Sequence, residues 1–202
     1  MKDFDERYWK KKEILGDYGY KVKLIKKLVP LEEGLEILDF GCGKGNITLD
    51  MLSVNPSLSI TGVDVSKIAI ASARKKMPKH KFYTIADGKK LPFKDNSFDF
   101  ITALDILMCV YDTELIFKEL SRVLKPKGKL LITEPYYGLL KNIVIALIGF
   151  ERVFNPRGAT IRFYTKKSLM NEIKAVGLSP VTFGYYGRFY PFSRGMYCIS
   201  RK

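Results

Sequence analysis

Three glycines within five residues, Gly41, Gly43 and Gly45, follow an apolar run in the segment ILDFGCGKGN (residues 37–46). A phosphate-binding P-loop requires G-x-x-x-x-G-K-[ST], but the glycine-lysine pair here is followed by Gly45 instead of serine or threonine. A dinucleotide-binding loop requires G-x-G-x-x-G, and the third glycine here comes one residue too early. Asp39, just before the loop, places a carboxylate that would repel a pyrophosphate. The pattern therefore predicts a tight turn whose backbone lies close to a cationic or neutral polar ligand.

Two further acidic residues extend this predicted ligand. Asp64 ends the strand in TGVDVS, 19 residues after Gly45, and a carboxylate there can accept hydrogen bonds from both hydroxyls of a ribose. Asp87 in IADGKKLPF could accept a hydrogen bond from an exocyclic amine, although the same residue could instead cap a turn. Together with the glycine loop, the two carboxylates indicate an adenosine whose tail carries no phosphate.

The elements that must position these residues follow from hydrophobic periodicity. Apolar runs rich in β-formers alternate with amphipathic helical patterns from about Glu36 onward, which predicts an α/β protein with a mostly parallel sheet and helices on both faces. The predicted strands are 36–40, 59–63, 81–86, 98–103, 130–134, 179–186 and 195–200, and the predicted helices are 46–53, 67–76, 113–124 and 165–176. Ahead of the sheet, residues 4–28 are predicted to form two helical pieces, broken around 16–19, that act as a lid or pack on the sheet.

Ligands of such sheets bind beyond the carboxyl ends of the strands. The acidic residues that fall at or just past those ends are Asp39, Asp64, Asp87, Asp105 and Glu134. His80, the only histidine, falls at the amino end of the third predicted strand, which makes it a poor candidate for a catalytic base.

Length and cysteine usage describe the kind of protein that carries this site. With 202 residues, 47% of them hydrophobic, the chain can bury a full core and is predicted to form one domain, residues 1–202. The stretch MKDFDERYWKKKE lacks the apolar region of a secretory signal, which predicts a cytoplasmic protein. The three cysteines form no CxxC pair, so neither disulfides nor a metal site is expected.

The formal net charge of +14 is unevenly distributed. Residues 136–202 contain five Lys and six Arg against two Glu, a net charge of +9. A basic surface suggests an anionic partner, such as nucleic acid, a phosphorylated metabolite or a lipid headgroup. A lysine-rich solubilising surface explains the charge equally well.

Four motifs follow one another between Glu36 and Pro135: LDFGCGKG, TGVDVS, ADGKKLPFKDNSFDFITALDIL and ELSRVLKPKGKLLITEP. In this order and at this spacing they resemble the class I S-adenosylmethionine-dependent methyltransferases, of the small-molecule type similar to ubiquinone and menaquinone biosynthesis methyltransferases. The resemblance covers about half of the chain. It implies a Rossmann-like fold with a seven-stranded, mostly parallel sheet, S-adenosylmethionine as cofactor and S-adenosylhomocysteine as product.

The resemblance also implies which residues bind the cofactor, namely Asp39, Gly41, Cys42, Gly43, Gly45, Asp64, Val65, Asp87, Gly88, Asp105 and Ile106. In the family pattern the glycine loop and Asp39 would surround the methionine and ribose moieties. Asp64 would bind the ribose hydroxyls, while Val65, Asp87 and Gly88 would contact adenine. Asp105 and Ile106 would face the methionine end and the acceptor.

The catalytic residue is left open. Methyl transfer from a sulfonium is an in-line displacement on an activated carbon, so positioning can supply most of the catalysis and a general base is optional. The candidates at the correct end of the sheet are Asp105, Glu134, Tyr136 and Tyr137, with Tyr111 and Tyr164 behind them. Asp105 could instead cap a helix, and Glu134 and Tyr136 could be hydrogen-bonded structural groups.

Residues 136–164 follow the fifth predicted strand, where the resemblance places a substrate-covering insertion. Within it, 139–150 carries only Lys141 and Asn142 as polar side chains, which predicts a helix that is apolar on all sides. Such a helix is expected to bury two faces, as a cap in the core or as a dimer contact. An apolar acceptor pocket and a peripheral membrane contact are the alternatives. The segment is too short to span a bilayer, because crossing one needs roughly 20 residues.

Aromatic residues gather in the same part of the chain. From Tyr136 onward there are 13 of the 26 Phe, Tyr and Trp residues, concentrated in FGYYGRFYPF (183–192). This cluster could stack a planar acceptor, hold RNA bases or fill the connection between the last two strands.

The sequence therefore predicts an S-adenosylmethionine-dependent methyltransferase that acts on a small, apolar or aromatic acceptor, as a monomer or homodimer. One alternative is an RNA methyltransferase that uses the basic residues of 136–202. Another is a non-catalytic, cofactor-binding partner subunit. An oxidoreductase that uses a nicotinamide cofactor fits least well.

Overall fold

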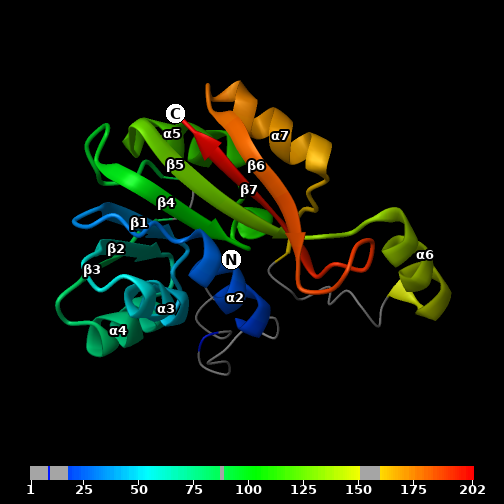
Figure 1. The fold of residues 1–202 in the computed structure, drawn as a ribbon, viewed down its shortest axis with the longest axis horizontal. Helices are drawn as coiled ribbons and strands as arrows, with labels where there is room; N and C mark the ends of the chain where they lie inside the picture. Colours follow the sequence, from blue (N-terminus) through cyan, green and yellow to red (C-terminus); the bar gives the residue numbers. More distant parts are fainter. Residues whose placement is uncertain (1–8, 10–17, 87–88, 151–159) are drawn as a thin grey trace.

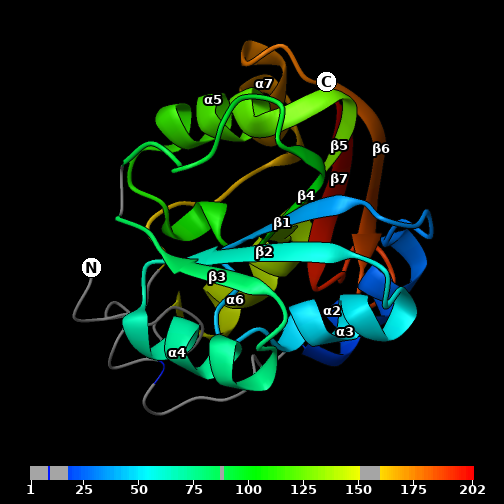
Figure 2. The same ribbon diagram turned by 90° about the vertical axis from the view of Figure 1, so that its left-hand side faces the viewer.

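The computed structural model describes residues 9, 18–86, 89–150 and 160–202, and these residues form one seven-stranded sheet between helices (Figure 1, Figure 2). The strand order is β3-β2-β1-β4-β5-β7-β6. β7 is antiparallel to both of its neighbours, and the other pairs are parallel. The strands are β1 (Glu36–Phe40), β2 (Ser59–Asp64), β3 (Lys81–Thr84), β4 (Phe98–Leu104), β5 (Leu124–Pro135), β6 (Ser179–Tyr186) and β7 (Gly195–Arg201).

Helices cover both faces of this sheet, as Figure 2 shows. One face carries α2 (Tyr18–Leu28), α3 (Asn46–Val54) and α4 (Lys67–Lys76), and the other carries α5 (Thr113–Val123) and α7 (Lys166–Ala175). A short 3-10 helix, η1 (Leu107–Cys109), follows β4. α6 (Leu139–Ile148) lies apart from both layers, at one end of the molecule (Figure 1).

The predicted α/β sheet with helices on both faces is confirmed. Strands 36–40 and 179–186 and helix 67–76 are found with their predicted bounds. β5 begins at Leu124, earlier than predicted, because Leu124 pairs with Phe98 before the register shifts between Phe98 and Phe100. Of the two helical pieces predicted in 4–28, the second is α2, whereas the first falls largely outside the described residues.

Side chains of the central strands belong to two separate hydrophobic cores, one on each face of the sheet. In β1, Leu38 and Phe40 pack with Phe117 under α5, whereas Ile37 packs with Met51 of α3 on the opposite face. This alternation follows from the two-residue period of a strand, and it makes both faces of β1 apolar because helices cover both. β1 and its following loop are therefore held rigidly from both sides.

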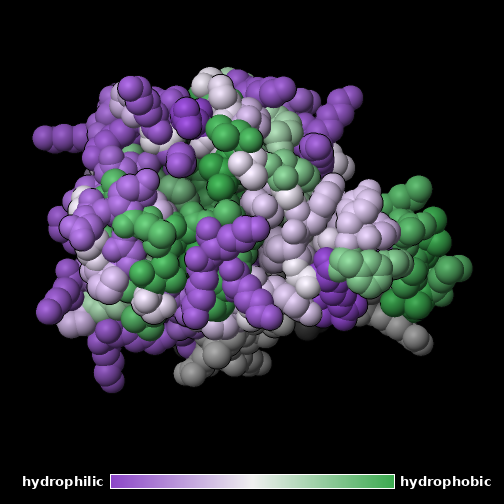
Figure 3. Space-filling view, viewed as in Figure 1, coloured by the Kyte–Doolittle hydropathy of each residue, from purple (hydrophilic) through white to green (hydrophobic). Residues whose placement is uncertain are grey.

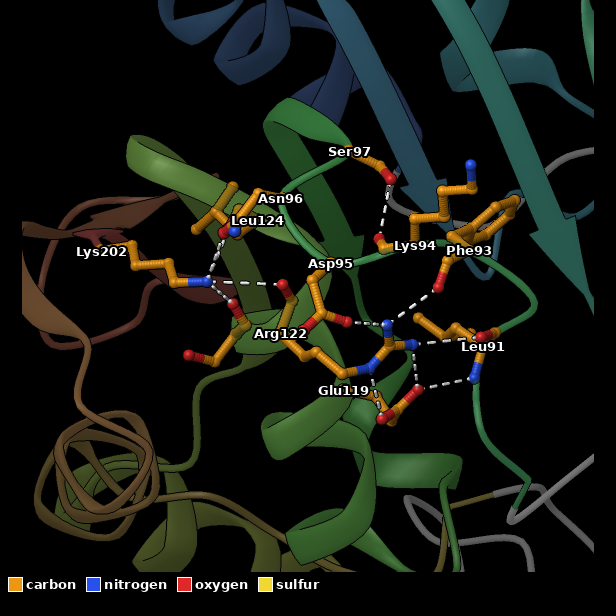
Figure 4. Close-up of polar contacts among 11 residues, drawn as sticks. Leu91, Phe93, Lys94, Asp95, Asn96, Ser97, Glu119, Arg122, Leu124 and Lys202 are labelled. Carbon is orange, nitrogen blue, oxygen red and sulfur yellow. Dashed lines mark hydrogen bonds and ion pairs between the residues drawn. The ribbon is translucent and has the colours of Figure 1, made fainter.

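An ion-pair network fixes the loop that precedes β4 (Figure 4). Arg122 of α5 donates to the carbonyl oxygens of Leu91 (3.1 Å) and Phe93 (2.8 Å) and pairs with Asp95 (2.7 Å). Glu119 pairs with the same guanidinium (2.7 Å) and accepts from the Leu91 N–H (2.8 Å). The network therefore anchors to α5 the segment from Leu91 to Asp95, which leads into β4.

α6 is less buried than the sequence predicted. The apolar segment 139–150 was expected to bury two faces of a helix, but within α6 only Ile145 is buried. The expectation of a cap helix packed in the core is therefore wrong. Hydrophobic periodicity reports how apolar a helix is, and it does not report what covers the helix.

Candidate functional site

The glycine loop joins β1 to α3 in a conformation that only glycine adopts easily. Gly41, Gly43 and Gly45 have φ angles of 77°, 53° and 76°, in the left-handed region that carries little steric cost without a Cβ. The N–H groups of Gly41 and Cys42 both donate to the carbonyl oxygen of Val63, at 2.8 and 3.0 Å. The loop is therefore pinned to the end of β2.

Asp39 lies buried beneath this loop and links three elements. Its Oδ2 accepts from the Thr48 hydroxyl of α3 (2.6 Å), and its Oδ1 accepts from the Thr102 hydroxyl of β4 (2.8 Å). Burial raises the pKa of the Asp39 carboxyl, and the two hydroxyl donors oppose that effect. Asp39 thus fixes the loop from below and places an acidic group there.

Asp64 connects the glycine loop to α4. Its Oδ2 accepts from the Gly43 N–H and its Oδ1 accepts from the Ser66 N–H, both at 2.9 Å. Ser66 in turn caps α4 by accepting from the Ala69 N–H. The carboxylate expected to bind a ribose therefore also organises the loop, and half-buried Val65 follows it directly.

Two of the predicted cofactor residues have packing roles. The buried Cys42 side chain packs with Ala73 of α4 and with Met77, the residue that follows α4, and burial raises the pKa of its thiol well above the usual value. A β-carbon at Gly45 would lie 2.4 Å from Met77 Cε, so this glycine allows α3 and α4 to approach each other. Asp87 and Gly88 lie outside the described residues.

Asp105 follows β4 and carries a buried ion pair that sequence reasoning missed. Lys21 Nζ of α2 lies 2.6 Å from Asp105 Oδ2, with the two side chains 2% and 8% exposed. Asp105 Oδ1 accepts from the hydroxyls of Thr133 (2.7 Å) and Tyr186 (3.4 Å). No sequence signal distinguishes Lys21 from the other lysines of α2, since the partner lies far along the chain.

The residues after β1 and β4 meet directly. A β-carbon at Gly41 would lie 2.5 Å from Ile106 Cγ1, so the Ile106 side chain covers this glycine. At Gly43 a β-carbon would lie 2.6 Å from Cη2 and Cζ2 of Trp9. The glycine loop is therefore approached by Ile106 from the β4 side and by an indole ring from the N-terminal segment.

Glu134, near the end of β5, is fully buried. Neither of its carboxyl oxygens has a partner with hydrogen-bond geometry among the described residues, although the N–H groups of Leu107 and Met108 lie nearby. Burial and the neighbouring Asp105 raise the pKa of Glu134 well above its usual range. Burial raises the pKa of the Tyr164 hydroxyl, and the nearby Glu134 carboxyl acts in the same direction.

Aromatic side chains from two segments gather at the end of the sheet where Asp105 and Glu134 lie. The rings of Tyr136 and Tyr185 lie 4.7 Å apart, and Tyr190 lies 5.0 Å from Tyr185. Burial, with the Tyr190 hydroxyl nearby, raises the pKa of Tyr136 to about 12. Tyr137 packs on Phe163 at 5.0 Å, and burial and then the Asp105 charge raise its pKa.

Other candidates lie away from this edge. His80 directly precedes β3, at the amino end of the strand, and accepts from the Ile60 N–H at 3.4 Å. In the described part of the chain no group of three or more His, Cys, Asp and Glu side chains could hold a metal ion. The carboxylates, the glycine loop and the aromatic cluster surround the ends of β1, β2, β4 and β5.

Comparisons with known proteins match most of the chain to one family of proteins. A family model described as "Methyltransferase domain" matches residues 31–175. A phosphoethanolamine N-methyltransferase of Caenorhabditis elegans is 32% identical over 122 residues, which are 58% of this chain and 28% of that protein. A demethylmenaquinone methyltransferase of Staphylococcus aureus is 30% identical over 139 residues, 66% of this chain and 58% of that protein. The chain thus spans about a quarter to three fifths of these relatives.

A solved structure shows the same fold. A SAM-dependent methyltransferase from Methanosarcina mazei superposes with a TM-score of 0.67 at 27% sequence identity. The match covers 85% of this chain and 94% of the archaeal one. The glycine loop and the strands β1 to β5 lie inside residues 31–175, the region that the family model matches.

Proposed function

The chain belongs to the class I S-adenosylmethionine-dependent methyltransferases, with S-adenosylmethionine as the cofactor, and from this premise we propose that it methylates a small, apolar or aromatic acceptor. The observation that carries the proposal is the contact between the Tyr186 hydroxyl and Asp105 Oδ1 at 3.4 Å. This contact brings the aromatic cluster to the end of β4, next to the glycine loop. A planar or apolar acceptor would be held there by ring stacking.

The residues present fit this cofactor. S-adenosylmethionine supplies a methyl group on a cationic sulfonium, together with a ribose and an adenine. Asp39 and Asp64 make the region around the loop acidic, which suits a cationic ligand and disfavours a pyrophosphate. The three left-handed glycines let the backbone come close to a ligand without a steric barrier.

We assign the individual contacts as follows. Gly41 and Gly43 lie against the methionine and ribose moieties, and Asp64 accepts from the ribose hydroxyls in addition to holding the loop. Val65 lies against the adenine ring, with Asp87 and Gly88 near it. Asp105 and Ile106 face the methionine end, an assignment supported by the contact of Ile106 with Gly41. The contact of the Trp9 ring with Gly43 supports the proposal that the N-terminal segment 1–30 forms a lid.

Catalysis in this proposal rests on positioning. Glu134 is fully buried, and its pKa is raised well above the usual range by that burial, so it has no open face toward an acceptor. Tyr136, with a pKa of about 12, keeps its proton. Asp105 is engaged by Lys21 and Thr133. Holding the acceptor nucleophile in line with the sulfonium methyl group then supplies the rate.

The experiment is a transfer assay with methyl-labelled S-adenosylmethionine and a cell extract, separated into organic-soluble, small aqueous and macromolecular fractions. Label in the organic or small aqueous fraction is the expected result. Label that stays in the macromolecular fraction and is removed by RNase or by protease would replace the proposal with an RNA or protein substrate.

A matched control separates transfer by this protein from background. Gly43→Val places bulk against the cofactor loop, so the same extract with this variant should show no label above the level without enzyme. Label that persists undiminished with the folded variant would show that the transfer arises elsewhere. Calorimetric binding of S-adenosylmethionine without any labelled product would favour a non-catalytic cofactor-binding subunit.

A further inference from the structure

α6 exposes apolar side chains around almost its whole circumference. Leu139 is 76% exposed and Leu147 is 81% exposed. The large apolar residues of α6 that are exposed are Leu139, Leu140, Ile143, Val144, Leu147 and Ile148. Figure 3 shows these hydrophobic residues gathered at the end of the molecule that α6 occupies. A patch of this kind marks an interaction site rather than ordinary surface.

A second exposed apolar group belongs to the turn between β6 and β7. Phe189 is 75% exposed and Tyr190 is 63% exposed, and both lie in residues 187–194 between the two strands. Tyr190 packs near Tyr136, which lies three residues before the start of α6 (6.1 Å between ring centroids). In Figure 1 the turn points toward the same end of the molecule as α6. We call α6 together with residues 186–195 the apolar tip.

The charges of the apolar tip are all positive. Its ionised side chains are Lys141, Arg188 and Arg194, and residues 136–150 and 186–195 contain no Asp or Glu. Arg194 and Arg188 lie close enough to Lys141 for their charges to lower its pKa, although burial is the larger cause. Within the described part of the chain, none of the three forms an ion pair.

We propose that the apolar tip docks on the surface of an anionic lipid bilayer. The ten-residue α6 is about 15 Å long, half of the roughly 30 Å hydrocarbon thickness, so it lies in the interface instead of crossing it. Leucine, isoleucine and phenylalanine side chains enter the boundary between headgroups and acyl chains, while the three cations contact lipid phosphates. In the described residues no helix has the length and apolar content to cross a membrane.

Charge favours a bilayer over a second copy of this chain as the occupant. Two apolar tips packed against each other would bring Lys141, Arg188 and Arg194 of both copies together, with no carboxylate in either tip to compensate. Anionic headgroups supply that compensation. The proposal goes beyond the methyltransferase activity and needs neither cofactor nor acceptor, so its failure leaves the proposed function untouched.

The test is cosedimentation of the full chain with vesicles, without S-adenosylmethionine. Vesicles of phosphatidylcholine that contain about 30% phosphatidylglycerol should bind the protein, because anionic headgroups attract basic segments. Vesicles of phosphatidylcholine alone should bind it at least about tenfold more weakly, and raising the salt concentration should release it from the anionic ones.

Two pairs of variants locate the contact. Leu139→Gln/Leu147→Gln should weaken binding about tenfold or more, because two apolar side chains no longer enter the interface. The matched control Leu31→Gln changes a leucine that is 72% exposed between α2 and β1, and it should bind as the wild type does. Arg188→Gln/Arg194→Gln should weaken binding to anionic vesicles only, whereas Lys26→Gln/Lys27→Gln on α2 should leave it unchanged.

Three outcomes would overturn the proposal. The first is an absence of vesicle binding by the folded wild-type protein. The second is equal binding of the Leu139→Gln/Leu147→Gln variant and its Leu31→Gln control, which would place the contact elsewhere. The third is a dimer in light scattering that the double leucine variant dissociates, with no vesicle binding, which would make a second copy the occupant.

Discussion

Lys21 and Asp105 form a buried ion pair in which α2 reaches across to the end of β4, with Nζ 2.6 Å from Oδ2. Asp105 has a φ angle of 51°, a left-handed conformation that aspartate tolerates better than most residues. Its N–H donates to the Thr133 carbonyl oxygen (2.9 Å), and its Oδ1 accepts from the Thr133 hydroxyl. The pair therefore ties the N-terminal helix to the two strands that border the proposed methyl-transfer site.

Lys21→Met is expected to lower the free energy of unfolding by about 3 kcal/mol, because it leaves the Asp105 carboxylate buried without its cation. The double variant Lys21→Met/Asp105→Asn should recover a large part of that loss, since the amide is neutral and asparagine also tolerates positive φ. Urea denaturation measures both. Equal destabilisation of the single and the double variant would mean that packing of the Lys21 stem, and not the ion pair, stabilises the junction.

Asp64→Ala should weaken binding of S-adenosylmethionine by about 1 to 3 kcal/mol, since two ribose hydroxyls lose their acceptor and the Gly43 N–H loses its partner. Isothermal titration calorimetry gives the affinity directly. Asp99→Ala is the matched control, because Asp99 also accepts from a backbone N–H, that of Glu36 (3.0 Å), but at the opposite end of β4. If both variants bind the cofactor as the wild type does, the ribose assignment is wrong.

The sheet and the glycine loop could be predicted because their signals are local. A short apolar run marks β1, and a glycine-rich turn at its end marks the loop, whatever the rest of the chain does. The positions of Asp39, Asp64 and Asp105 at carboxyl ends followed from that same frame.

The remaining features depend on contacts between distant segments. Lys21 resembles the other lysines of its helix until Asp105 is brought beside it, so no pattern in α2 could reveal the pair. Glu134 was a candidate base by position alone, and only packing shows that its carboxyl group is fully buried, with no partner of hydrogen-bond geometry among the described residues. The exposure of α6 was missed for the same reason, because composition predicted an apolar helix but not the absence of a covering layer among the described residues.

Gly43→Val should lower cofactor affinity at least about tenfold, a cost of about 1.4 kcal/mol, because a β-branched side chain enters the loop where φ is 53°. Gly34→Val is the control for backbone strain alone, because Gly34 has a φ of 69° and its β-carbon would meet nothing within 4 Å. Trp9 adds a second test, since its ring would lie 2.6 Å from the new β-carbon. If Trp9→Ala/Gly43→Val regained full affinity, the loss would come from the indole clash and not from a blocked ligand.

Glu134→Gln should stabilise the protein, and increasingly so as the pH rises. Burial raises the folded-state pKa of Glu134 above its ordinary value of 4.5, so the folded protein holds a proton that the unfolded chain releases. Below about pH 4.5 both states are protonated, and the wild type and the variant should unfold with similar free energies. As the pH rises from about 4.5 toward the folded-state pKa, the wild type loses stability by as much as about 1.4 kcal/mol per pH unit, and the loss levels off above that pKa, whereas the neutral glutamine does not titrate. Denaturant unfolding of both proteins between pH 5 and pH 8 measures the difference. A gap that stays constant over this range, or narrows with rising pH, would show that the Glu134 carboxyl is already ionised in the folded protein and remains available as a base.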